Sequence, residues 1–299
     1  MENPLIDLGK LSEPLTKLVK VISTGIGGGY APFGTIRQAK ADAKAKIIHA
    51  TADAEVAAIE QRAQSRLKYR EELRQENIEK IACQAALALP EAVSSDVLDK
   101  DWIVQYFDHA QDVCDDDMQV LWAKILAGEV SSPGSYSKRT LQFLKTMDKL
   151  DAEFFTKYCA LSFSMSNGWM HFFENDITRK FILQEAGDYA LSQHFNDIGL
   201  VNTEGLGTPS AFHEIRIDYL DKQLKFIKLK KKEENSLIPM LEPPFGFRAF
   251  SQVGQELSRI AGAKPVKGFL EELKHHFESE YQLSIVDANA PTQEDSPDQ

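Results

Sequence analysis

The sequence predicts a mainly α-helical protein that ends in a smaller α+β module of winged-helix type. A long Ala-rich, highly charged stretch without Pro or Gly fills residues 36–89, and shorter stretches with aromatic residues at helical spacing follow Pro90. Alternating apolar residues appear only near the C-terminal end. We expect five parts: an amphipathic segment with a Gly-rich hinge (1–35), a very long helix (36–90), a helical bundle (91–167), the winged-helix-like module (168–286) and a disordered acidic tail (287–299).

The very long helix would extend roughly 80 Å at 1.5 Å per residue, too far for one small domain to cover. Its apolar residues recur every three or four positions, with intervals of eleven, which is typical of a straight or slightly right-handed seam. The expected seam consists of Ile48, Ala52, Val56, Ile59, Ala63 and Leu67. We expect this seam to form a homo-oligomer of coiled-coil character, and a solvated, charged strut is the alternative.

Composition places the chain in the soluble globular class, with 43% hydrophobic residues and a formal charge of -11. The acidic balance disfavours broad nucleic-acid binding, although a local basic surface remains compatible with it. Cys83, Cys114 and Cys159 lack the spacing of a zinc site or a disulfide framework. No apolar run is long enough to span a bilayer, and Lys17 and Lys20 interrupt the N-terminal apolar segment, so no signal peptide is expected. These features indicate a cytoplasmic protein.

A short basic amphipathic segment precedes the hinge. Its apolar face consists of Leu15, Leu18, Val19, Ile22 and Ile26. Such a face can lie on a membrane surface, here the inner membrane, or dock on the protein core or on another subunit.

Three local patterns could suggest chemistry, and each has a structural explanation. The Gly-rich run 25–29 lacks the Lys and Ser/Thr of a phosphate-binding loop, and Ser135 with Lys138 matches a serine-enzyme spacing without its other motifs. The acidic run 115–117 beside His109 and Asp112 could bind a metal, but Asp is also the residue expected at a helix N-cap. We therefore expect no catalytic residue, no cofactor and no metal.

The C-terminal module contains two expected strands on either side of a turn at Asp221 and Lys222, followed by a helix over 250–260. Lysines lie on and after the second strand, and Lys225, Lys228 and Lys230 are the candidate nucleic-acid contacts of a wing. The alternative is a solvated edge strand that its lysines protect from aggregation.

The stretch from Asp115 to Phe155, DDDMQVLWAKILAGEVSSPGSYSKRTLQFLKTMDKLDAEFF, resembles an uncharacterised bacterial family, a domain of unknown function. From Met118 to Phe155 it is also loosely similar to alpha-type phage abortive-infection proteins. The matching positions are Leu121, Trp122, Ile125, Leu126, Ala127, the Pro133 region, Leu141, Leu144, Asp151, Ala152 and Phe155. They are mostly packing residues, so the resemblance implies a shared helical fold, and it brings no catalytic residues.

The function expected from this resemblance is a non-enzymatic antiphage factor that self-assembles through its long helix and acts at the membrane. A second protein, either an effector or a phage trigger, is a further expected partner. The alternatives are a DNA-associated regulator that uses the C-terminal module and a structural scaffold for a separate effector.

Overall fold

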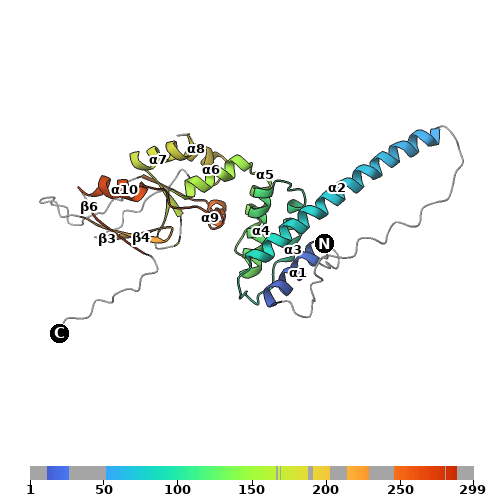
Figure 1. The fold of residues 1–299 in the computed structure, drawn as a ribbon, viewed down its shortest axis with the longest axis horizontal. Coiled ribbons are helices and arrows are strands. Elements are labelled where there is room, and N and C mark those ends of the chain that lie inside the picture. Colours follow the sequence, from blue (N-terminus) through green and yellow to red (C-terminus); the bar gives the residue numbers. More distant parts are fainter. Residues whose placement is uncertain are drawn as a thin grey trace, which may run out of the picture. The chain divides into compact units, whose positions relative to one another are not determined.

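The computed structural model describes residues 12–26, 52–165, 168, 170–187, 191–202, 214–228, 246–279 and 281–287. The chain divides into two compact units, Met1–Thr146 and Met147–Gln299 (Figure 1). The described residues are mainly helical, and they also form one six-stranded antiparallel sheet. The expected mainly α-helical class is therefore confirmed. Among these residues, no helix has the length and apolar character that crossing a bilayer requires.

The described part of the first unit consists of helices and the loops that connect them. Its helices are α1 (Glu13–Gly25), α2 (Ala52–Ala88), α3 (Lys100–Ala110), α4 (Asp116–Ser131) and α5 (Lys138–Thr146). Helix α1 packs on α3 and α4, the C-terminal part of α2 packs on α4 and α3, and α5 packs on α3. Buried aromatic residues of α3 and α4 form the centre of this unit, where Trp102 stacks on Tyr106 at 5.2 Å between ring centroids.

Side chains of the first unit satisfy the backbone groups that helix ends leave unpaired. The Asp115 carboxylate accepts hydrogen bonds from the backbone N–H groups of Asp117 and Met118 and so begins α4. At the other end of α4, the buried Glu129 carboxylate accepts from the N–H groups of Gly134 (2.7 Å) and Tyr136 (3.0 Å). This carboxylate holds the loop after α4 against the core.

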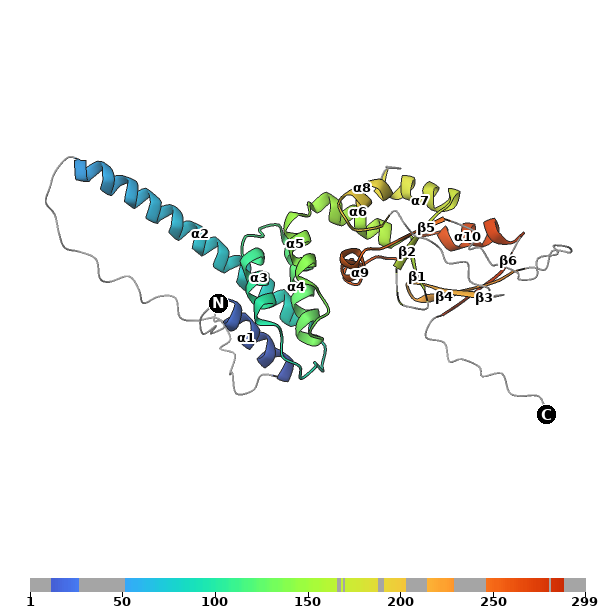
Figure 2. The same cartoon turned by 180° about the vertical axis from the view of Figure 1, so that it is seen from behind.

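The described part of the expected long helix is α2, with 37 residues from Ala52 to Ala88. Residues 36–51 lie outside the described residues. In both views α2 runs on beyond the other helices of its unit (Figure 2).

The second unit contains a mixed set of helices and strands. These are α6 (Lys149–Cys159), β1 (Ser162–Met165), β2 (Met170–Glu174), α7 (Asp176–Ala186), α8 (Leu191–Asp197), β3 (Glu214–Tyr219), β4 (Lys222–Lys228), β5 (Gly246–Ala249), α9 (Gln252–Ser258), α10 (Phe269–Phe277) and β6 (Tyr281–Asp287). The strand order is β5-β2-β1-β3-β4-β6, with every neighbouring pair antiparallel. Neighbouring residues of a strand point to opposite faces of the sheet.

Aromatic residues cover both faces of this sheet. On one face Phe172 stacks on Tyr158 of α6 at 4.1 Å between ring centroids. On the opposite face Phe163 contacts Tyr219 and Phe269, the first residue of α10. The alternation of the strands therefore builds two aromatic clusters from one sheet.

The strands differ from the sequence expectation in one respect, and one open alternative is excluded. The β3–β4 hairpin is part of a six-stranded sheet, whereas the sequence predicted a separate two-stranded ribbon. Strand β6 pairs with β4 from Lys222 to Lys228, so the alternative of a solvated edge strand does not hold for β4. The division between the two units falls after Thr146. Helix α6 belongs to the sheet unit because its aromatic residues pack on the strands.

Candidate functional site

An exposed apolar row lies on the N-terminal half of α2. We call residues 58–72 the α2 arm. Every residue from Ile59 to Glu72 is exposed, including Ile59 (57% exposed) and Leu67 (51%). Further along the same helix Ile78, Ile81 and Ala85 are buried. One helix thus has a half that belongs to the core and a half that contacts little else in its unit.

The apolar row of the arm lies on the side of α2 that is buried further along. Five turns of an α-helix take eighteen residues, so positions eighteen apart point in the same direction. Ile59, Ala63 and Leu67 each precede a buried residue by this interval, namely Asn77, Ile81 and Ala85. The arm therefore extends the same face that α3 and α4 cover on the C-terminal half.

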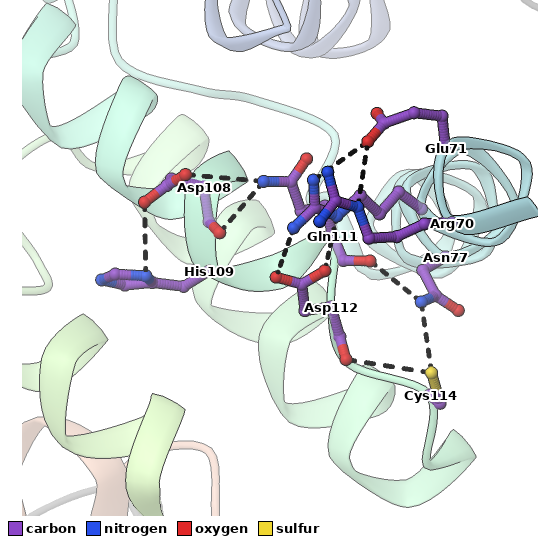
Figure 3. Close-up of polar contacts among 9 residues, drawn as sticks. Arg70, Glu71, Asn77, Asp108, His109, Gln111, Asp112 and Cys114 are labelled. Carbon is purple, nitrogen blue, oxygen red and sulfur yellow. Dashed lines mark hydrogen bonds and ion pairs between the residues drawn. The ribbon is translucent and has the colours of Figure 1, made fainter. Parts of the chain in front are cut away.

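An ion pair joins the base of the arm to the turn after α3 (Figure 3). The Arg74 guanidinium donates to both carboxylate oxygens of Asp112, with Nε at 2.6 Å from Oδ1 and Nη2 at 3.0 Å from Oδ2. Its Nη1 also donates to Glu71 at 3.1 Å. The hydrogen bond from Arg74 lowers the pKa of Asp112, and the same bond raises the pKa of Arg74. Because the Asp112 side chain is half exposed, solvent screening makes this pair a modest contribution to stability.

A buried amide pair beside this ion pair fixes the position of α2 along the turn. Asn77 Nδ2 donates to the carbonyl oxygen of Gln111 at 2.9 Å and to the Cys114 sulfur at 3.5 Å. Gln119 Nε2 donates to Asn77 Oδ1 at 3.0 Å and to the carbonyl oxygen of Val113 at 2.8 Å. Both amide side chains are buried. A shift of α2 along its axis would break these directional bonds, so the arm leaves the unit at a fixed position.

Two of the acidic residues near the turn have structural roles. Asp112 is engaged by Arg74, and Asp115 caps α4, so the N-cap interpretation is confirmed for Asp115. His109 is buried, and its Nδ1 lies 3.9 Å from a carboxylate oxygen of Asp108. Within the described ranges, no group of three or more His, Cys, Asp or Glu side chains could hold a metal ion.

The amphipathic face of α1 is largely enclosed by its own unit. Leu18 and Ile22 are buried, whereas Leu15, Val19 and Ile26 are half-buried. At the end of α1 a Cβ on Gly25 would lie 2.0 Å from the Phe107 ring, which shows how closely α1 approaches α3. Within its unit this face therefore packs on the core.

The three candidate lysines do not form a common described site. Lys225 lies on the face of β4 opposite to the buried Leu224 and Phe226. Lys228 is the last residue of β4, and the structure does not describe its side chain. Lys230 lies outside the described residues. The structure instead places Arg216 of β3 directly opposite Lys225. Counting outwards from the turn at Asp221 would have identified Arg216 from the sequence.

The chain is therefore a two-unit protein. A helical unit carries the exposed arm of α2, and an α+β unit follows it in the sequence. The chain belongs to the family described as Protein of unknown function (DUF2806), whose family model matches residues 61–274. An uncharacterised family is thus confirmed. No curated protein and no solved structure matches the chain.

Proposed function

We propose that this chain is a non-enzymatic self-assembling protein in which the α2 arm joins copies. One observation carries the proposal: the arm exposes Ile59, Ala63 and Leu67 in a row that continues a buried helix face. Burial of apolar surface gains about 25 cal/mol per Å². The row on the arm is the same kind of apolar surface that α3 and α4 cover on the C-terminal half of α2. A partner helix that buried this row would therefore be stabilised.

The base of the arm favours such a role. An isolated helix must lose conformational entropy before it can bind, whereas a helix anchored to a folded unit has already lost it. Arg74 and Asn77 tie α2 to the turn after α3, so the arm is held in place before any partner arrives.

The biological setting that we propose is antiphage defence of the abortive-infection type. The loose similarity of Met118–Phe155 to alpha-type abortive-infection proteins motivates it. Buried Leu18 and Ile22 limit the membrane part of this hypothesis, because membrane contact by this face would first require α1 to leave its unit. A scaffold for a separate effector is the related alternative, and a stoichiometric second protein in purified assemblies would favour it.

Sedimentation equilibrium of the full chain tests the proposal. We expect a concentration-dependent oligomer that Ile59→Glu weakens at least tenfold, because the substitution introduces a charge into the apolar row. The matched control Gln61→Glu alters an exposed residue about 200° around the helix and should leave association unchanged. A wild-type chain that stays monomeric at high micromolar concentration would refute self-assembly.

Phage plating on a host that expresses the same variants then tests the defence role. Protection by the wild type and by Gln61→Glu, with loss of protection in Ile59→Glu, would connect assembly with defence. Absence of protection across a broad phage panel would refute the antiphage role while leaving self-assembly intact.

A second candidate function is that of a DNA-associated regulator with a winged-helix-like C-terminal module. The pair formed by Arg216 and Lys225 favours it, because it places two basic side chains directly opposite each other on one face of neighbouring strands, and basic side chains are what contacts a phosphate backbone. DNA retention at low salt should fall in Lys225→Glu. It should persist in the control Lys222→Gln, since Lys222 is paired with Asp287. DNA binding that is absent at low salt, or is unaffected by Lys225→Glu, would exclude this function.

A further inference from the structure

We infer that two copies of the chain pair through their α2 arms in antiparallel orientation, with Ala63 of each copy at the twofold axis. This inference rests on the proposed self-assembly and specifies its geometry. The occupant of the exposed row is a second copy of the same helix.

The spacing of the apolar row is symmetric about Ala63. Ile59 and Leu67 lie at equal intervals on either side of it. In an antiparallel pair, Ile59 of each copy would lie at the level of Leu67 of the other copy. The two small Ala63 side chains would meet at the centre, between these two levels. Small residues at the centre let two helices approach closely, while the flanking large side chains bury apolar surface.

The charge along α2 favours the antiparallel orientation over the parallel one. Residues 52–60 contain three acidic residues and no basic one, whereas residues 61–70 contain four basic residues and no acidic one. A parallel pair in register would place basic segment against basic segment. An antiparallel pair centred on Ala63 places the acidic segment of each copy along residues 66–74 of the other, where four basic residues outnumber Glu71 and Glu72.

The position of α3 and α4 favours the same orientation. They cover the side of α2 that carries the row, from Asn77 onwards. A parallel partner in register would bring a second α2 and its own α3 and α4 into this occupied space. An antiparallel pair centred on Ala63 brings residues 58–68 of the two copies together, before the covered part of α2 begins at Asn77.

Cysteine cross-linking tests the orientation after sedimentation has established the oligomeric state. The background is the full chain with Cys83→Ser and Cys114→Ser, because these two thiols are exposed while Cys159 is buried. Ala63→Cys should form a covalent dimer on oxidation. Chains with Ile59→Cys should cross-link to chains with Leu67→Cys when the two are mixed. Neither variant should form a covalent dimer by itself. In a dimer of one variant, the two introduced cysteines are about 12 Å apart along the axis, beyond the reach of a disulfide.

Gln61→Cys is the matched control, since this residue lies on the side of the arm away from the row and should not cross-link. Self-cross-linking of both Ile59→Cys and Leu67→Cys in an oligomeric chain would overturn the antiparallel arrangement and leave self-assembly standing. An oligomer without cross-links at any of the row positions would place the interface elsewhere and overturn the inference. A monomeric chain would overturn self-assembly as well, and another chain segment or protein would then cover the row.

Discussion

Replacement of Asn77 tests whether the buried amide pair anchors the α2 arm. The side chain is 2% exposed, donates to the Gln111 carbonyl oxygen and accepts from Gln119. Asn77→Ala removes these two bonds, at about 1 kcal/mol each, together with the longer hydrogen bond to the Cys114 sulfur. It also leaves a small cavity and a carbonyl group without its amide donor, which together cost about 1–2 kcal/mol more. We expect the free energy of unfolding of the first unit to fall by about 3–4 kcal/mol.

Urea unfolding followed by tryptophan fluorescence measures this loss in the appropriate unit. Of the three tryptophans in the chain, Trp102 and Trp122 are buried in the first unit. Glu76→Ala is the matched control, because the neighbouring residue is exposed and its loss should change stability by less than about 0.5 kcal/mol. If Asn77→Ala matched this control, the buried pair would not anchor the helix.

Three further predictions concern close packing, the α1 face and acidity. Gly254→Ala should destabilise the second unit by about 1–3 kcal/mol in thermal melts, because its Cβ would lie 2.0 Å from the Leu200 backbone oxygen; a neutral outcome would disprove this close approach. Leu18→Asp should lower stability of the first unit by about 3 kcal/mol or more, since it buries an unpaired charge, and unchanged unfolding would show that α1 is not docked. Burial, with a smaller contribution from Lys145, lowers the pKa of His109 below its ordinary 6.5. The buried neutral imidazole therefore contributes to stability above pH 6.5, and this contribution is lost as the pH falls below 6.5. His109→Gln should therefore reduce the difference between melting temperatures at pH 7.5 and 5.5, and an unchanged difference would exclude His109 as its source.

The elements with clear local signals were predicted well from the sequence. Asp115 was expected to cap a helix because a short carboxylate satisfies free N–H groups, and the structure shows these bonds. The apolar spacing of α1 and the two strands β3 and β4 were also predicted correctly, since such patterns report which side chains share a face. Local spacing does not report which element covers that face, so docking and membrane contact remained open for Leu18 and Ile22.

The sequence by itself determined the helical first unit, the exposed charge of α2 and the periodic row of Ile59, Ala63 and Leu67, because periodicity and capping are local properties. Only the tertiary structure decided that this row continues a buried face. The point on α2 where the buried part ends and the exposed row begins depends on the contacts of Arg74 and Asn77 with the turn after α3. The residues of that turn lie more than thirty positions away in the sequence. The tertiary structure likewise placed β6 beside β4 and Arg216 opposite Lys225, because strand order depends on which distant segments pair and the composition of each segment is compatible with several partners.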